Sequence, residues 1–362
     1  MLEQFEKYFD GGARDNAIAR AARSTSLMRP TMDGMLGGRL GGTLLTTDAA
    51  IGGGGAFLQS ELEKLDPKVR EPLTSVTWMR DIPIKSGGGW VDFTSTFNVD
   101  YGISGPNFYG LMGGETNQIP TIQANLNKDI YRVFNWGNVL KVSFIDMQKI
   151  QQAGRSLEDM LDKGVKLNWN KTLDLVVYNG PFTGYLGLVN QGSSITQSSV
   201  AAGAAGHLAW STKTPDEILY DINAAMVATW AASEYDVTGM ANHILIPPAQ
   251  FAMLLRKVSE AGNVSILEYL LANNIGKTQG VELKIFPSRW CISAGAGSPA
   301  TQRMVAYVND EDRVYLDVTV PINRVMTMPT VADGGAYLTL YLGQIGVVKF
   351  LFYTPVIYYD GI

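Results

Sequence analysis

The chain has 362 residues, and 46% of them are hydrophobic, which indicates about two domains with a sizeable core. A formal net charge of −5 gives no overall basic character of the kind that favours nucleic acid. The single cysteine, Cys291, excludes an intrachain disulfide framework, and His207 and His243 are too few to build a multi-histidine metal site.

Glycine is abundant, with 39 residues, whereas only 17% of the residues are charged. A soluble monomer usually displays more charge than this. A subunit that buries much of its surface against copies of itself needs less. The composition therefore favours a self-associating protein.

Neither a signal peptide nor a membrane span is expected. The segment 1–10 carries Glu3, Glu6 and Asp10 and lacks an apolar stretch. The uncharged run 334–348 alternates Tyr and Thr with Leu, which is the period of a strand and not of a bilayer helix. The default expectation is a cytosolic location.

Residues 1–55 predict an arm instead of a domain, because Gly-Gly pairs recur and the apolar residues show no sustained period. Basic residues are concentrated in this arm: Arg14, Arg20, Arg23, Arg29 and Arg39, against Asp15 and Asp33. One interpretation is an arm that contacts a neighbour, a scaffold or enclosed nucleic acid. The other is a solvated, disordered tail. A short helix is predicted at 57–65, and an extended segment at 76–84.

A long excursion rich in glycine and aromatic residues follows at 81–118. The segment 90–93 predicts a strand, and the triglycine 87–89 before it predicts a hairpin tip. The candidate contact residues of this excursion are its lysine and its aromatic side chains: Lys85, Trp90, Phe93, Phe97, Tyr101, Phe108 and Tyr109. The aromatic side chains either fold back on their own domain or lie on an adjacent subunit, since such residues are enriched at interfaces.

Residues 119–142 predict two strands separated at 125–128. A short helix is expected next, and then a long helix over 156–178, where apolar residues recur at i, i+4 steps. Asn179-Gly180 predicts the C-terminal cap of the long helix. The segment 184–190, Gly-Tyr-Leu-Gly-Leu-Val-Asn, predicts a turn.

A compact α/β region is predicted over 214–320. Thr214-Pro215-Asp216-Glu217 combines an N-cap, a proline in the first turn and a capping glutamate, which indicates a helix start. The further predicted elements are a strand at 243–246, helices at 251–258 and 265–272, a strand at 281–285, and strands at 304–308 and 314–320 that pair as a hairpin. The tail from Arg324 onwards is strand-like.

No catalytic or cofactor motif emerges from the sequence. Gly276-Lys277-Thr278 lacks the preceding glycine of a phosphate-binding loop, because Leu271 occupies that position. His207 lies in a Gly/Ala run and His243 begins a strand, so neither has a patterned catalytic partner. The acidic tip 310–312 is interpreted as solvated. We therefore expect no enzymatic activity, no cofactor and no bound metal.

This order of parts resembles the major capsid proteins of tailed bacteriophages, whose fold is named after phage Hong Kong 97. The turn at 187–190 after the long helix and the closing Tyr353-Thr354-Pro355-Val356-Ile357 also resemble that family. The resemblance implies an α+β fold of five parts: an N-terminal arm (1–73), an extended loop with flanking strands (74–128), a peripheral domain with a long spine helix and a β-sheet (129–213), an axial α/β domain (214–320) and the return strands of the peripheral domain (321–362).

The function that the resemblance implies is structural. Copies of the chain would assemble into the pentamers and hexamers of an icosahedral phage head that encloses double-stranded DNA without sequence-specific binding. The implied partners are copies of the chain itself and separate scaffold, portal and decoration proteins, with no membrane. The implied location is the virion capsid, after assembly in the host cytoplasm.

Three other functions remain open from the sequence. One is the shell of an encapsulin-like protein compartment, which shares the fold. Another is a phage structural protein outside the shell, such as a tail component, which would form rings or tubes. The last is a cytosolic α/β enzyme with an unrecognised site, which predicts a small oligomer with a concave pocket.

Overall fold

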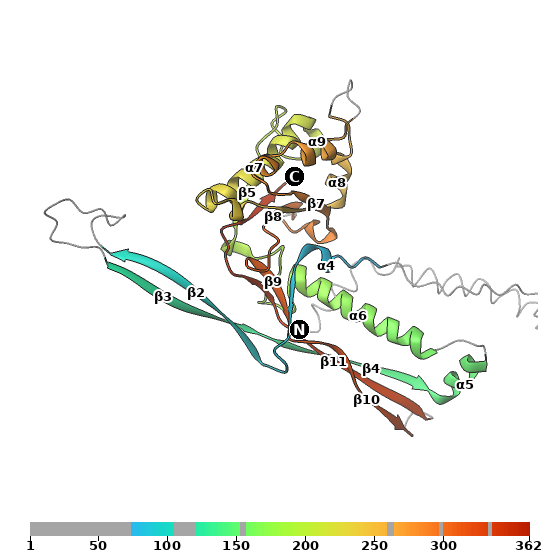
Figure 1. Cartoon of the computed structure of the whole chain (residues 1–362). Helices are drawn as coiled ribbons and strands as arrows, with labels where there is room; N and C mark the ends of the chain where they lie inside the picture. Colours follow the sequence, from blue (N-terminus) through green and yellow to red (C-terminus); the bar gives the residue numbers. More distant parts are fainter. Residues whose placement is uncertain (1–73, 105–120, 153–156, 259–263, 297–299, 332–334) are drawn as a thin grey trace, which may run out of the picture. The chain divides into compact units, whose positions relative to one another are not determined.

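The computed structural model describes residues 74–104, 121–152, 157–258, 264–296, 300–331 and 335–362. Figure 1 shows these residues as helices and strands coloured along the chain. The predicted arm with its five arginines, the predicted helix at 57–65 and the tip of the excursion with Phe108 and Tyr109 lie outside the described residues.

A five-stranded sheet lies at the centre of the region predicted as α/β, in the strand order β5-β13-β8-β6-β7. Its strands are β5 (Thr196–Ser199), β6 (His243–Ile246), β7 (Lys284–Pro287), β8 (Arg303–Tyr307) and β13 (Val356–Asp360). β6 runs parallel to β7 and antiparallel to β8, and β13 is antiparallel to β8. The last strand of the chain therefore pairs inside this sheet, whereas the sequence analysis grouped all of 321–362 with the peripheral sheet.

Helices cover one face of this sheet. They are α7 (Pro215–Ala232), α8 (Pro248–Leu254), α9 (Ile266–Ala272) and α10 (Ile275–Thr278). Ile244 and Ile246 of β6 point into the apolar cluster under these helices, while Leu245 belongs to the cluster on the opposite face. This alternation is what a strand buried on both faces requires. The predicted capping box of Thr214 and Glu217 is confirmed at the start of α7.

The opposite face of the sheet packs on the long helix α6 (Leu157–Asn179), which the sequence predicted over 156–178. Trp169, Leu173 and Val177 of α6 are buried in this second cluster. A three-stranded sheet in the order β1-β9-β12 completes it, formed by β1 (Ile84–Ser86), β9 (Val314–Val318) and β12 (Val348–Phe350). Two short elements lie beside α6: α4 (Trp78–Asp81) and the 3-10 helix η5 (Arg289–Cys291).

The end of α6 forms the predicted turn. Gly180 has a φ of +87°, as expected for a helix C-cap, and Leu188 N–H donates to the carbonyl of Val177 at 2.7 Å. The Asn190 side chain donates to the carbonyl of Asn179 at 2.9 Å and accepts from Gly187 N–H at 2.6 Å. One amide side chain therefore closes the turn from both sides.

A further three-stranded sheet, in the order β10-β11-β4, has long strands and lies against α6. We call it the long sheet. Its antiparallel strands are β4 (Phe134–Ser143), β10 (Val320–Thr330) and β11 (Ala336–Ile345), and β4 leads into α5 (Phe144–Gln152). The rings of Trp136 and Trp169 meet edge to face with centroids 5.0 Å apart, and Tyr341 OH donates to Asp162 at 2.8 Å. These contacts fix which face of the sheet α6 covers.

The excursion is a long antiparallel hairpin of β2 (Phe93–Ser104) and β3 (Thr121–Arg132). Its register runs without a break from Phe93 opposite Arg132 to Ser104 opposite Thr121. Only Val133 separates β3 from β4, so the hairpin continues directly from the long sheet (Figure 1).

Several sequence predictions in this part of the chain were wrong. The triglycine 87–89 is not a hairpin tip: it joins β1 to β2, and all three of its φ angles are positive. The strand begins at Phe93 and not at Trp90. The break predicted at 125–128 lies inside β3, because the Asn residues there face solvent in a strand and do not form a turn. The segment 76–84 contains the helical turn α4 instead of being extended throughout.

Other corrections concern the α/β region. The strands predicted to pair as a hairpin do not pair with each other. β8 pairs with β6 and β13, whereas β9 pairs with β1 and β12, so the acidic segment 309–313 connects two different sheets. The helix predicted at 251–258 is α8, which begins at Pro248 in the N1 position and ends at Leu254. The strand predicted at 281–285 is β7, which begins at Lys284.

Candidate assembly surfaces

The β2–β3 hairpin is amphipathic across its two faces. Residues directly opposite each other in a hairpin share a face, and successive residues alternate between faces. One face therefore carries the odd-numbered residues of β2 and the even-numbered residues of β3. Its large apolar side chains are Phe93, Phe97, Val99, Tyr101, Ile103, Ile122, Leu126 and Ile130. We call this set the apolar hairpin face.

The other side of the hairpin is polar. It carries Asn98, Asp100, Asn127 and Asp129, among Thr, Gln and further Asn residues. Asn98 donates to Asp129 at 3.1 Å, and Asn127 donates to Asp100 at 3.4 Å, each across the two strands. The two acidic side chains of the hairpin strands thus lie on the polar face, while Lys128 lies on the apolar face with its Nζ 5.6 Å from the centre of the Phe97 ring.

The polar face, and not the apolar one, turns toward the body of the subunit at the base of the hairpin. Thr96 is 8% exposed, and Tyr131 on the same face lies 5.1 Å from the Nζ of buried Lys349 in β12. By contrast, Phe97 is 63% exposed, Leu126 68% and Tyr101 75%. The subunit therefore leaves the apolar hairpin face pointing away from its own core.

A second apolar surface lies on the long sheet, on the side opposite α6. The register places Val139, Leu338, Leu340, Met326 and Met328 on this side. Val139, Met326 and Met328 are exposed, and the leucines between them are half-buried. A contiguous exposed apolar patch of this kind is typical of a protein interaction site.

The candidate contact residues of the sequence analysis fall in different places. Phe93, Phe97 and Tyr101 lie together on the apolar hairpin face, and Trp90 is exposed just before β2. Lys85 lies apart from them in β1, where its Nζ is 4.1 Å from the centre of the Tyr315 ring. Sequence reasoning missed Ile122, Leu126 and Ile130. Their alternation with Asn and Gln residues was the available signal, and it was interpreted as an interruption.

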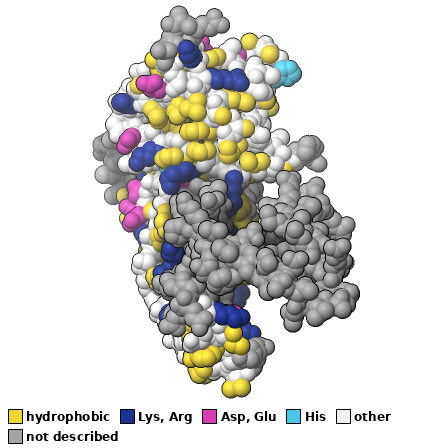
Figure 2. Space-filling model, turned by 90° about the vertical axis from the view of Figure 1, so that its right-hand side faces the viewer, with side chains coloured by type: hydrophobic (Ala, Val, Ile, Leu, Met, Phe, Trp, Pro, Cys, Tyr) yellow, Lys and Arg dark blue, Asp and Glu magenta, His cyan; other side chains and the backbone are white. Residues whose placement is uncertain are grey.

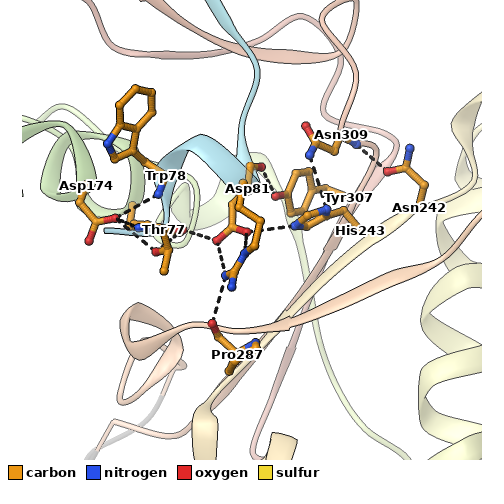
Figure 3. A network of polar contacts seen from close by, with 11 residues as sticks. Thr77, Trp78, Asp81, Asp174, Asn242, His243, Pro287, Tyr307 and Asn309 are labelled. Atoms are coloured by element: carbon orange, nitrogen blue, oxygen red, sulfur yellow. Dashed lines mark hydrogen bonds and ion pairs between the residues drawn. The ribbon is translucent and has the colours of Figure 1, made fainter. Parts of the chain in front are cut away.

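A buried polar network fixes the segment that leads into the hairpin. Asp174 of α6 accepts hydrogen bonds from Thr77 N–H at 3.0 Å and Trp78 N–H at 3.2 Å, so it caps α4 from a different helix. Its second oxygen accepts from Trp290 Nε1 at 2.9 Å. Figure 3 shows Asp174, Thr77 and Trp78 at one end of this network.

Asp81 is the centre of the same network (Figure 3). Its buried carboxylate accepts from Arg80 at 2.6 and 2.9 Å and from Tyr178 OH, and His243 Nε2 lies 3.3 Å away. Tyr307 OH donates to its backbone carbonyl. Burial opposes ionisation of Asp81, but the hydrogen bonds from His243, Arg80 and Tyr178 outweigh it and hold its pKa below the ordinary value. These contacts join α4 to α6, β6 and β8.

His243, which the sequence analysis considered as a catalytic candidate, is thus a buried member of a structural network, between Asp81 and Asn309. Cys291 is fully buried, and burial raises the pKa of its thiol to about 12. In the described residues, no three His, Cys, Asp or Glu side chains come together in a way that suits a metal ion. The helices described here include none with the length and apolar character needed to cross a membrane.

An α+β subunit with two exposed apolar sheet surfaces and a hairpin that is preceded by a buried polar network is typical of a protein that associates with other chains. The comparisons specify the family. The model of the family described as "Major capsid protein" matches residues 110–362. The chain therefore belongs to the major capsid protein family. No curated protein matches the sequence.

Solved structures show the same fold. The capsid of Myoviridae phage XM1 is 16% identical, with a TM-score of 0.67 over 89% of this chain and 100% of that chain. The capsid of a native GTA particle is 11% identical, with a TM-score of 0.55 over 82% and 94%. Microbacterium phage Oxtober96 is 13% identical, with a TM-score of 0.53 over 84% and 97%. The fold is thus that of phage capsid subunits.

Proposed function

We propose that copies of this major capsid protein assemble into the pentamers and hexamers of an icosahedral phage head, with the apolar hairpin face of each copy covered by an adjacent copy. The observation that carries the proposal is the orientation of the hairpin. Its polar face packs on its own subunit at the base, and its apolar face is left for another surface.

The energetics favour such a contact. Full burial of one large aliphatic or aromatic side chain stabilises by about 1.5–3 kcal/mol. The apolar hairpin face carries eight such side chains along two strands, all of them exposed in the described subunit. A contact of this kind repeats around every ring of a closed shell, so modest single contacts accumulate into a stable assembly.

The parts of the chain follow the order of the Hong Kong 97-type fold. The arm is residues 1–73, and the extended loop with its flanking strands is 74–128. The peripheral domain is 129–213, with α6 as its spine helix, and the axial domain is 214–320. The segment 321–362 returns to the peripheral sheet through β10 and β11. The pairing of β11 with β4 supports this arrangement, except that β13, the last strand of the chain, pairs with β5 and β8 inside the five-stranded sheet.

The proposed head also involves contacts of the arm, enclosed DNA and other head proteins. The arm arginines Arg14, Arg20, Arg23, Arg29 and Arg39 contact neighbouring copies or the scaffold. The shell encloses double-stranded DNA without sequence-specific binding, which suits a chain of net charge −5. Separate scaffold, portal and decoration proteins complete the head, which assembles in the host cytoplasm and becomes the virion capsid.

Electron microscopy of the purified chain, alone and with the products of neighbouring genes, tests the proposal. Closed shells of uniform diameter support it, and a monomer or dimer under every condition overturns it. Rings or tubes without closed shells point instead to a phage component outside the head. Particles that enclose protein and never nucleic acid point to a compartment shell.

A pair of hairpin variants tests the contact itself. Leu126→Asp with Ile130→Asp places two charges on the apolar hairpin face, and shell yield should fall at least about tenfold. The matched control, Gln123→Glu with Asn125→Asp, adds the same charge to the polar face of the same strand and should leave the yield unchanged. Equal yields from the two variants would refute the assigned orientation.

A further inference from the structure

We infer that neighbouring copies within a ring contact each other through two complementary surfaces of the axial region: an acidic aromatic edge on one copy and a basic apolar patch on the next. The inference rests on the proposed ring assembly and names the residues that hold the ring together around its axis. It concerns surfaces separate from the hairpin.

The acidic aromatic edge lies at the end of the five-stranded sheet where β6 begins. It consists of exposed side chains from the loop after α7 and from the loop after β8: Glu234, Tyr235, Asp236, Asp310, Glu311 and Asp312. Arg313 joins the two loops, because its guanidinium donates to Thr238 Oγ1 at 2.9 Å. Asp236 caps the 3-10 helix η4 (Val237–Gly239) by accepting from Thr238 N–H at 3.0 Å.

The backbone presents Tyr235 in an unusual way. Glu234 and Tyr235 have φ angles of +53° and +61°, two consecutive residues in the left-handed region without a glycine. Such a conformation costs about 1–2 kcal/mol per residue, and it persists where the surroundings and the function require it. The ring of Trp230 meets Tyr235 edge to face at 5.2 Å and holds it in place. An exposed, fixed tyrosine is a typical anchor of a protein interface.

The basic apolar patch lies where the chain leaves α8 and enters α9. It consists of Leu255, Arg256, Lys257 and Val264, all exposed. Two backbone hydrogen bonds hold the two segments together, from Val258 N–H to Val264 O at 3.1 Å and from Ile266 N–H to Arg256 O at 2.8 Å. Figure 2, seen from the side on which Figure 1 places α8, shows hydrophobic side chains gathered on this face with Lys and Arg beside them.

The two surfaces have opposite charge. The edge carries five exposed acidic side chains, Glu234, Asp236, Asp310, Glu311 and Asp312, against the half-buried Arg313. Among the described residues of 248–281, Arg256, Lys257 and Lys277 stand against one acidic residue, Glu268. Opposite charges across an interface select the partner and fix its orientation, whereas like charges there cost several kcal/mol.

The position of the two surfaces suits a ring. The edge is at the start of β6, and α8 begins directly after the end of β6. Because the surfaces are made of different residues, each copy offers its edge to one neighbour and its patch to the other. Such a head-to-tail contact forms a ring where the rotation between copies closes, as the proposed pentamers and hexamers require, whereas a self-complementary contact stops at a dimer.

Charge reversal tests the pairing. The edge-reversed variant is E311K/D312K, and the patch-reversed variant is R256E/K257E. Each alone should reduce the yield of rings and shells at least about tenfold, because like charges then face each other. The matched control for the patch-reversed variant, K149E/K171E, makes the same charge change as R256E/K257E at exposed positions of α5 and α6 and should assemble normally. Gel filtration and circular dichroism verify that all subunits are folded.

Combining the variants gives the decisive outcomes. A chain that carries all four substitutions, E311K, D312K, R256E and K257E, has a basic edge and an acidic patch. Opposite charges then face each other at every contact, so closed shells should form again. An equal mixture of the two reversed chains should form hexamers in which the chains alternate, as sheets or tubes. It should not form closed shells, because a ring of five cannot alternate two kinds of subunit.

The results separate the two proposals. If the wild-type chain forms no shells, the proposed function fails. If the wild type assembles and either reversed variant assembles equally well, the paired surfaces are wrong while the function stands. The pairing is also overturned if the chain with all four reversals fails to assemble. It is overturned as well if the mixture of the two reversed chains forms dimers and no larger rings.

Discussion

Gln344 and Val91 are joined like two backbone amides in neighbouring strands. Val91 N–H donates to Gln344 Oε1 at 3.2 Å, and Gln344 Nε2 donates to the carbonyl of Val91 at 2.9 Å. The buried Gln344 side chain also accepts from Thr319 Oγ1 and donates to Asn135 Oδ1, both at 2.8 Å. One side chain therefore ties the residues before β2 to β4 and β11, and so fixes the direction in which the hairpin leaves the subunit.

Replacing Gln344 by Glu should weaken the attachment of the segment before β2 to β4 and β11. The change keeps the shape but removes both donors, and it places a carboxylate oxygen against the carbonyl of Val91 and the Asn135 oxygen. Unmade buried hydrogen bonds cost about 1–3 kcal/mol. We expect that loss in urea unfolding, with faster hydrogen exchange at Val91. Gln123→Glu, the same change at an exposed hairpin position, should cost little. Equal losses in the two variants would contradict the anchoring role of Gln344.

Elements whose sequence pattern lies entirely within the element or its caps were predicted correctly from the sequence. Ser265 caps α9 by accepting from Glu268 N–H at 3.1 Å, and Thr214 caps α7, because a capping pattern contains both partners within one turn. The long helix α6 was found because its apolar stripe is continuous. In these segments the residues that predict the element lie near one another in the chain, although the apolar stripe of α6 itself packs on distant residues.

Long-range contacts decide the parts that sequence reasoning missed. The helical turn α4 depends on Asp174, which lies almost a hundred residues further along the chain. β8 and β9 are adjacent in sequence but belong to different sheets: β8 pairs with β6 and β13, and β9 pairs with β1 and β12. The apolar hairpin face was recognised only through its aromatic residues. Leu126 and Ile130 join Phe97 on that face only once the register of β2 with β3 is known.

Asp81→Asn should lower stability in a manner that depends on pH. The folded-state pKa of Asp81 is held below its ordinary value, so the carboxylate contributes stability above the unfolded pKa of about 3.9 and loses it as the pH falls through the folded pKa. Breaking a buried charged network typically costs about 3–5 kcal/mol. We expect a loss of this order in urea unfolding at pH 7.

The difference between wild type and Asp81→Asn should shrink as the pH is lowered from 5 toward 2. Asp162→Asn is the matched control. Hydrogen bonds from Lys166 and Tyr341 also lower the pKa of Asp162, but this side chain is partly exposed and solvent screens it. Its replacement should therefore change stability far less. A pH-independent gap between wild type and Asp81→Asn would show that the ionised carboxylate is not what the network requires.

The turn after α6 should tolerate no side chain at Gly187 or Gly180. A Cβ on Gly187 would lie 2.4 Å from the carbonyl of Tyr178, and a Cβ on Gly180 would lie 2.0 Å from the Tyr185 oxygen. Both neighbours are backbone atoms, so the turn itself would have to move. Gly184 has a positive φ of +96° but open space around it.

Gly184→Ala should therefore cost only the backbone strain, about 1 kcal/mol, whereas Gly187→Ala and Gly180→Ala should cost clearly more. Urea unfolding of the three variants gives the ranking. A loss at Gly184 as large as that at Gly187 would mean that conformation, and not close approach, controls this turn.

The thiol of Cys291 should be unreactive in the folded subunit. Burial raises its pKa to about 12, so the thiol stays protonated at pH 8, and its side chain is fully buried. We expect a thiol reagent to label the native protein only as fast as the segment around η5 opens, and at once in urea. Ala252→Cys, which adds an exposed thiol on α8, should be labelled immediately under native conditions. Rapid labelling of the native wild type would contradict the packing of Cys291 in the apolar cluster that contains residues of α6 and of the five-stranded sheet.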